Sequence, residues 1–149
     1  MPKSFKWSDA KITGWIYFIE YHDSGPVKIG YAKNVDKRLC NLQTACPYEL
    51  RVLVAAPGSI DCETILHAYL SNFMIRGEWF WPVPELQKIV RRLRAFEHKY
   101  PDFADICRNV VNGNLGKSLK EIYGEVPIDL IINHNLSDEQ LSTFKQDRE

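Results

Sequence analysis

The hydrophobic and polar positions between residues 15 and 38 follow the pattern of a β-hairpin that leads into a helix. The run Trp15–Tyr21 is almost entirely aromatic and β-branched, which suits a half-buried strand. His22–Pro26 is dense in turn-forming residues, so Val27–Tyr31 is predicted to return as the antiparallel partner. Asn34 suits the N-cap of a helix that begins near Val35.

The rest of the chain divides into further helices and strands by the same criteria. Apolar positions three and four residues apart predict helices, and short apolar or β-branched runs predict strands. The expected elements are a helix at Val35–Gln43, a central strand at Leu50–Ala56, a helix from Ser59 or Asp61 to about Phe73, a short aromatic strand or edge at Glu78–Trp81 and a helix from Glu85 to about Lys99. They predict an α/β fold of the α+β type, in which helices flank a small three-stranded antiparallel sheet and a helical C-terminal extension follows.

Composition narrows the class of protein. The 149-residue length suits one domain with an appendage, and an apolar fraction of 45% is enough for a hydrophobic core. No apolar run is long enough to span a bilayer, and no secretion signal is visible, so we expect a cytoplasmic protein without a membrane partner. The four cysteines show no CxxC spacing, which is typical of reduced thiols.

The charges balance overall but are unevenly distributed. Residues 1–109 hold 15 Lys/Arg against 12 Asp/Glu, whereas residues 110–149 hold 4 against 7. Any phosphate binding must therefore come from a local basic face. Lys88, Arg91 and Arg92 lie outside the apolar stripe of the last predicted helix, where a solvated face and a surface that follows a phosphate backbone are both open interpretations.

Residues suited to phosphate chemistry recur along the hairpin and the helices that follow it. Glu63 and His67 are four apart, so both project from one side of their helix. An arginine guanidinium matches the geometry of phosphate oxygens. Each residue also has an ordinary structural interpretation, as a core residue or as a helix-dipole partner. Tyr17, Lys28, Tyr31 and Arg38 are expected to converge near the end of the hairpin and the helix that follows it, and they form the candidate active centre.

At these residues the sequence resembles the GIY-YIG nuclease superfamily. The two signature triplets correspond here to Trp15-Ile16-Tyr17 and Lys28-Ile29-Gly30; Lys28 lies 11 residues after Tyr17, and Arg38 follows ten later. GYAKN at 30–34, ETILH at 63–67 and GEWF at 77–80 resemble the branch found in phage proteins and in meiotically up-regulated fungal proteins. The resemblance covers about Gly14 to Trp81.

The resemblance implies a metal-dependent endonuclease that hydrolyses DNA phosphodiester bonds and leaves a 5′-phosphate and a 3′-hydroxyl. It assigns Tyr17 to water activation, Arg38 and Lys28 to stabilisation of phosphate charge, and Glu63 to binding of Mg²⁺ or Mn²⁺. His67 would assist at the metal or at the phosphate. The expected DNA-contacting residues are Lys33, Lys37, Lys88, Arg91 and Arg92.

Lys28 departs from the superfamily pattern, because most members have tyrosine at this position. Lysine binds phosphate and can act as a base where its pKa is lowered. Tyr31 would restore a hydroxyl group, but residues three apart in a regular strand lie on opposite faces of the sheet. Some branches resemble this sequence in carrying lysine, so the change does not indicate an inactive enzyme.

Two alternatives stay open: a non-cleaving nucleic-acid-binding module with the same fold, and a nuclease that acts on RNA. Because one active centre cuts one strand, double-strand cleavage would require a dimer or two visits, and the oligomeric state stays open. The expected organisation is a polar lead-in at 1–13, a nuclease-like domain at 14–83, a helical extension packed on it at 84–132 and an acidic, mobile tail at 133–149.

Overall fold

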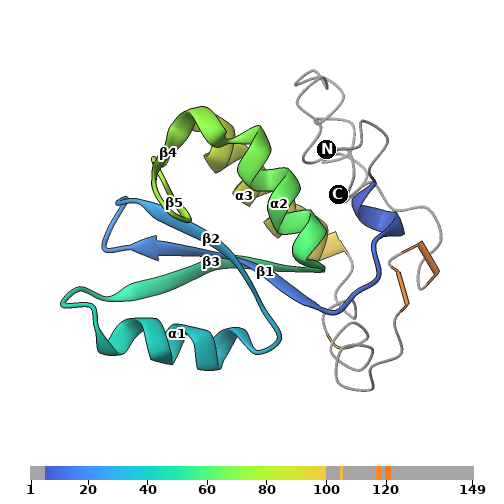
Figure 1. Cartoon of the computed structure of the whole chain (residues 1–149), viewed down its shortest axis with the longest axis horizontal. Helices are drawn as coiled ribbons and strands as arrows, with labels where there is room; N and C mark the ends of the chain where they lie inside the picture. Colours follow the sequence, from blue (N-terminus) through green and yellow to red (C-terminus); the bar gives the residue numbers. More distant parts are fainter. Residues whose placement is uncertain (1–5, 100–104, 106–116, 119, 122–149) are drawn as a thin grey trace.

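The computed structural model describes residues 6–99 together with 105, 117, 118, 120 and 121. Figure 1 shows a sheet with helix α1 on one side and helices α2 and α3 on the other. Short 3₁₀ turns lie at Trp7–Asp9 and Ser71–Phe73. The elements are β1 (Gly14–Tyr21), β2 (Val27–Ala32), α1 (Val35–Thr44), β3 (Leu50–Gly58), α2 (Ile60–Tyr69), β4 (Met74–Arg76), β5 (Trp79–Phe80) and α3 (Pro84–Lys99).

Among the described residues the sheet has five strands in the order β3-β1-β2-β5-β4, and all of these pairings are antiparallel. The α+β class is confirmed, but the expectation of three strands is wrong. The expected central strand Leu50–Ala56 is also wrong in its place, because β3 lies at the edge of the sheet. Its apolar sequence reflects helices on both of its faces, not strands on both of its edges.

The predicted hairpin and the helix after it are confirmed. The register of β1 and β2 places Tyr17 opposite Gly30 and Ile19 opposite Lys28. The Asn34 side chain caps α1 by accepting a hydrogen bond from the Lys37 backbone N–H at 3.0 Å. Such a cap satisfies one of the otherwise unpaired amides of the first turn, which fixes where the helix begins.

The second helix begins as predicted but ends earlier. Ser59 is its N-cap, in a capping box with Cys62. The helix was expected to reach Phe73, whereas α2 ends at Tyr69 and a 3₁₀ turn follows. Ser71 and Asn72 explain the early end, because their short polar side chains compete with the helix backbone for hydrogen bonds.

Each face of the sheet covers its own hydrophobic core. On the α1 face, Tyr17 and Ile19 pack with Leu39 and Leu42 of the helix. The core on the other face joins strand residues to α2 and α3 and includes Ile16, Phe18, Ile29, Leu66, Phe80 and Leu93. The alternation of side chains along β1 therefore decides which residues meet α1 and which meet α2.

The segment before β1 is part of the fold. Trp7 and Ile12 are buried in the core on the α2 and α3 face. Trp7 also donates from Nε1 to the Pro57 carbonyl at 2.7 Å. The expected polar lead-in therefore contributes packing as well as polar surface. The predicted extension is described continuously as far as α3; the predicted tail at 133–149 lies outside the described residues.

In the described part of the chain, no helix combines the length and the hydrophobicity that a membrane crossing requires.

Gly30 should be irreplaceable for a steric reason that a double-mutant cycle can isolate. A Cβ at Gly30 would overlap the hydroxyl and ring of Tyr17, which is 1% exposed. We expect Gly30→Ala to lower the free energy of unfolding by ~1–3 kcal/mol, the usual cost of overpacking a core. In a Tyr17→Leu background the same change should cost less, because the end of the ring is gone.

Urea denaturation of the four variants measures the coupling between these positions. Gly77→Ala is a suitable control, since Gly77 has a φ of 58° and no atom of the described residues lies within 4 Å of its Cβ position. Its cost should arise from backbone strain alone and should be the same with tyrosine or leucine at position 17. An equal cost of Gly30→Ala in both backgrounds would contradict the steric explanation.

Candidate active site

The candidate site lies where the pairing of β2 with β5 ends. β5 pairs with β2 at Val27 and Lys28, and the Ile29 amide also donates to the Glu78 carbonyl at 3.0 Å. The next carbonyl along this edge, that of Ile29, is bonded by His67 Nε2 of α2 at 2.8 Å. Because a carbonyl can only accept, His67 carries its proton on Nε2, and in the neutral ring Nδ1 keeps the lone pair. Helix α2 thus contributes side chains to the sheet edge.

Three potential metal ligands gather at this edge. Glu63 and His67 lie one turn apart on α2, and Glu78 immediately precedes β5. Their donor atoms all lie within 4.8 Å of one another, and the three residues are half-buried. Two carboxylates and an imidazole are a donor set that fits a divalent cation. Glu63 and His67 both belong to the set of candidate residues predicted from the sequence.

Glu78 is the member of this cluster that was absent from the expected set. Its sequence signal is the GEWF stretch, which suggests packing aromatics more readily than a ligand. Glu78 also forms an ion pair with Lys28, whose Nζ lies 3.0 Å from Oε1. Lys28 Nζ lies 5.6 Å from the centre of the Trp79 ring, within reach of a cation–π interaction. Glu78 therefore links Lys28 to the other two potential ligands, Glu63 and His67.

Tyr17 projects from β1, its ring lies over Gly30 of β2, and the pKa of its phenol is strongly raised. The absence of a side chain at Gly30 makes room for its ring. The pKa of Tyr17 is raised to about 12, chiefly by burial and then by Glu78, while Arg38 lowers it and Glu63 raises it. The phenol is therefore neutral at physiological pH. It can orient a water molecule by hydrogen bonding, but it is a poor base without added positive charge.

The pKa of the Glu63 carboxyl is also raised, and burial and Glu78 are again the main causes. Burial raises its pKa most, followed by the Coulombic effect of Glu78; His67 lowers it, a hydrogen bond with Glu78 raises it further, and Lys28 lowers it. The two carboxylates therefore compete for ionisation at short range. A bound cation would relieve that competition, which is the electrostatic arrangement expected of a metal site.

The basic residues expected to contact DNA lie on both faces of the sheet. Lys33, Lys37 and Arg38 are exposed at the start of α1, on the same face as Tyr17. Helix α3 packs on the opposite face, where Arg91 is exposed. Arg92 was expected outside the apolar stripe, but it is 9% exposed, so that expectation is wrong for Arg92. Lys88, also on α3, is half-buried.

Tyr31 is separated from the other candidates. It packs with the core on the α2 and α3 face, whereas Tyr17 belongs to the α1 face. Its hydroxyl donates to Thr13 Oγ1 at 2.8 Å, and its ring lies against Gly14. The structure therefore does not bring the Tyr31 hydroxyl to Tyr17 and Lys28.

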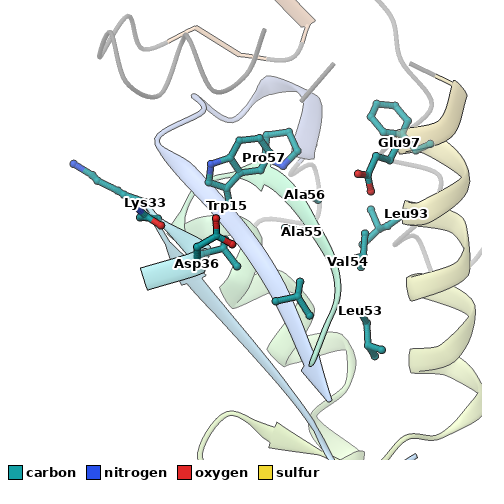
Figure 2. Close-up of a pocket in the computed structure, with 14 residues that line it drawn as sticks. Trp15, Lys33, Asp36, Leu53, Val54, Ala55, Ala56, Pro57, Leu93 and Glu97 are labelled. Carbon is teal, nitrogen blue, oxygen red and sulfur yellow. The ribbon is translucent and has the colours of Figure 1, made fainter. Parts of the chain in front are cut away.

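A cavity of about 490 Å³ lies apart from this cluster (Figure 2). It follows β3 between the start of α1 and helix α3, with Trp15 contributed by β1. Lys33 and Asp36 line one end, and Leu93 and Glu97 lie on the α3 side. Neither Tyr17 nor the three potential ligands line it, so the candidate chemistry lies outside this cavity.

The raised pKa of Tyr17 gives the free energy of unfolding a defined pH dependence. The folded protein holds this proton more tightly than the unfolded chain, so the contribution is complete below pH 10 and is lost as the pH rises towards about 12. Tyr17→Phe removes the group. Its free energy of unfolding should fall less steeply across this range, by a slope difference approaching ~1.4 kcal/mol per pH unit. Urea denaturation at a series of pH values tests this, and equal slopes would contradict the raised pKa.

Comparison with known proteins identifies the family. No curated protein and no solved structure matches the chain. Residues 14–94 match the T5orf172 domain, a domain found in phage proteins. The matched stretch begins with β1, contains Tyr17, Lys28, Glu63, His67 and Glu78, and ends within α3. Since it spans more than half of the 149 residues, the chain belongs to the T5orf172 domain family.

Proposed function

We propose that this protein is a metal-dependent endonuclease that hydrolyses phosphodiester bonds of DNA. The observation that carries the proposal is the group of Glu63, His67 and Glu78 at the open edge of β2, beside Lys28 and with Tyr17 within electrostatic reach. Hydrolysis of a phosphodiester needs an oriented water, positive charge near the phosphoryl oxygens and help for the leaving alkoxide. These residues offer the chemical groups for each need.

The motif resemblance to GIY-YIG nucleases supports the roles of individual residues. We assign Tyr17 to orienting the attacking water, because its phenol is neutral and its hydroxyl serves as both donor and acceptor. Arg38 is exposed and bears a permanent positive charge suited to a phosphate oxygen. Lys28 would shift from Glu78 towards the phosphate when substrate enters, since both partners offer anionic oxygens.

The donor set fits Mg²⁺ or Mn²⁺, with Glu63 as the principal ligand and Glu78 and His67 beside it. When bound, such a cation supplies Lewis-acid stabilisation of charge on the phosphoryl oxygens. Before substrate enters, Lys28 would keep the carboxylate of Glu78 oriented through their ion pair. DNA is proposed as substrate from the motif resemblance, because these groups address phosphate and not sugar.

The electrostatic competition between Glu63 and Glu78 predicts opposite effects on stability and activity. Glu63→Gln removes one negative charge at nearly constant shape, so the metal-free variant should melt at a higher temperature than the wild type near neutral pH. The raised pKa gives this sign, because ionised Glu63 opposes folding once the pH exceeds its folded-state pKa. The same variant should lose cleavage of supercoiled plasmid and lose the thermal stabilisation that Mn²⁺ gives the wild type.

Asp61→Asn is the matched control for Glu63→Gln. Asp61 lies in the first turn of the same helix and is exposed. The control should keep both cleavage and the Mn²⁺-dependent rise in melting temperature. Undiminished plasmid cleavage by Glu63→Gln in Mg²⁺ would reject Glu63 as a ligand.

The separation of the basic residues between two faces predicts which of them bind the DNA backbone. Lys33 and Lys37 accompany Arg38 on the Tyr17 face, so replacing both with Gln should flatten the log–log dependence of DNA affinity on salt by about two units. Replacing Lys88 and Arg91 with Gln should change that slope less, since α3 packs on the opposite face. Fluorescence anisotropy at several salt concentrations measures both slopes. A larger change from the α3 pair would place the DNA on the other face.

A further inference from the structure

Four aromatic rings form a continuous series that leads away from the candidate site. Trp79 lies opposite Lys28 in the β2–β5 pairing and forms an edge contact with Tyr21, with ring centres 6.1 Å apart. Tyr21 makes a second edge contact with Tyr48 at 5.7 Å. The Tyr48 ring in turn lies 4.7 Å from that of His22 at a shallow angle of 37°. We call these four residues the ring series.

The ring series becomes more exposed with distance from the site. Trp79 and Tyr21 are half-buried, whereas Tyr48 is 49% exposed and His22 is also exposed. Burial of Tyr48 and His22 in the core therefore does not explain their contact. The half-buried end of the ring series adjoins a basic residue of the candidate site. Lys28 Nζ lies 5.6 Å from the centre of the Trp79 ring. A basic group thus adjoins one end of an aromatic surface.

The loop that carries Tyr48 is held by the side chain of Gln43. Its Nε2 donates to the carbonyls of Tyr48 and Cys46 at 2.9 and 3.4 Å, and its Oε1 accepts from the Leu50 amide at 2.8 Å. A single amide side chain thus fixes both sides of the loop. The exposed tyrosine is therefore presented on an ordered backbone, which lowers the entropy cost of binding a ligand.

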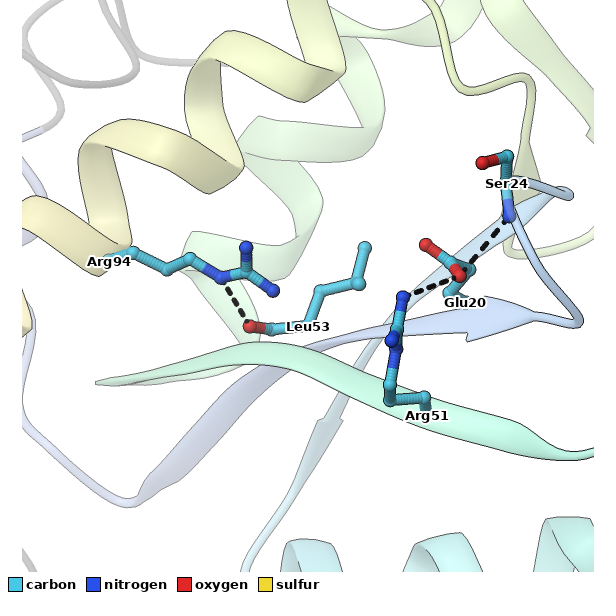
Figure 3. A network of polar contacts seen from close by, with 5 residues as sticks. All are labelled: Glu20, Ser24, Arg51, Leu53 and Arg94. Carbon is cyan, nitrogen blue, oxygen red and sulfur yellow. Dashed lines mark hydrogen bonds and ion pairs between the residues drawn. The ribbon is translucent and has the colours of Figure 1, made fainter.

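The turn that carries His22 is anchored from two directions. Figure 3 shows Glu20 accepting from the Ser24 amide at 3.2 Å and from Arg51 at 3.0 Å, which ties the turn to β3. The His22 amide donates to the Glu49 carbonyl at 3.2 Å. These bonds hold His22 at a positive φ of 55°, an uncommon backbone conformation for a residue other than glycine.

From this arrangement we propose that the ring series is a stacking surface for unpaired bases of a DNA strand whose phosphate occupies the candidate site. The proposal rests on the proposed nuclease function and adds to it the structural state of the substrate. Aromatic rings beside a cation are the combination by which proteins hold single-stranded nucleic acid, and stacking on a ring strengthens binding of each base. A duplex keeps its bases stacked inside, so it would gain little from Tyr48 and His22.

Binding without catalysis tests this inference directly. Fluorescence anisotropy would compare labelled oligothymidylate with a labelled duplex, in EDTA, on the wild type and on Tyr48→Leu. The variant should bind the single strand ~5- to ~150-fold more weakly, the equivalent of one lost stacking contact, and the duplex equally well. Tyr48→Phe keeps the ring and should keep single-strand affinity within about twofold of the wild type.

Trp81→Leu provides a matched aromatic control. Trp81 is 54% exposed and lies outside the ring series, so its removal should leave single-strand affinity unchanged. Retained duplex affinity and an unchanged melting temperature show that Tyr48→Leu is folded. Wild-type affinity of Tyr48→Leu for the single strand, or equal losses on single strand and duplex, would overturn the inference.

The same experiment separates this inference from the proposed catalytic function. If Tyr48→Leu binds the single strand as the wild type does while the wild type cleaves plasmid in Mg²⁺, the stacking surface is refuted and the nuclease stands. If Tyr48→Leu selectively loses single-strand binding while no metal supports cleavage, the stacking surface stands as part of a binding module and the nuclease is refuted.

Discussion

The early end of the pairing between β2 and β5 is the constraint on which the candidate site depends. Val27 and Lys28 pair with β5, and the Ile29 amide still donates to the Glu78 carbonyl. The Ile29 carbonyl is bonded by His67 instead. A continuous edge strand would satisfy the same backbone group but would exclude the side chains of α2. The incomplete edge therefore allows Glu63 from a helix and Glu78 from a turn to meet. Gly30 complements this edge, because its lack of a side chain lets the Tyr17 ring cross β2.

The two faces of the sheet have different roles: one carries most of the apolar core, and the other carries Tyr17 and basic residues. The face covered by α2 and α3 holds the larger apolar core, which includes Trp7 from the segment before β1. The α1 face carries the buried Tyr17 and the exposed basic start of α1. Because side chains alternate along a strand, a one-residue slip of β1 would move Tyr17 into the apolar core and destroy both arrangements. The hairpin register therefore matters as much as the identity of the residues.

Local features of the fold were predictable from the sequence, and long-range ones were not. Asn34 and the turn formers at 22–26 act within a few residues, so the hairpin and the start of α1 were predicted correctly. The edge place of β3 and the strand β4 were missed. β3 is apolar because helices cover it, and β4 is exposed along its whole length and shows no alternation. Glu78 was left out of the expected site in favour of a packing role, because its partners Glu63 and Lys28 are distant in sequence.

The hydrogen bond from Arg94 Nε to the Leu53 carbonyl, 2.8 Å long and drawn in Figure 3, has a consequence for how the molecule behaves at high concentration. β3 is an edge strand with a long apolar sequence, the type of edge that recruits strands from other molecules and begins aggregation. The guanidinium occupies an acceptor that an incoming strand would need and brings a positive charge to the edge. The opposite edge, β4, is three residues long and ends in Arg76, so it offers little template for strand addition. Within the described residues, an arginine thus lies at each edge of the sheet, Arg94 at β3 and Arg76 at β4.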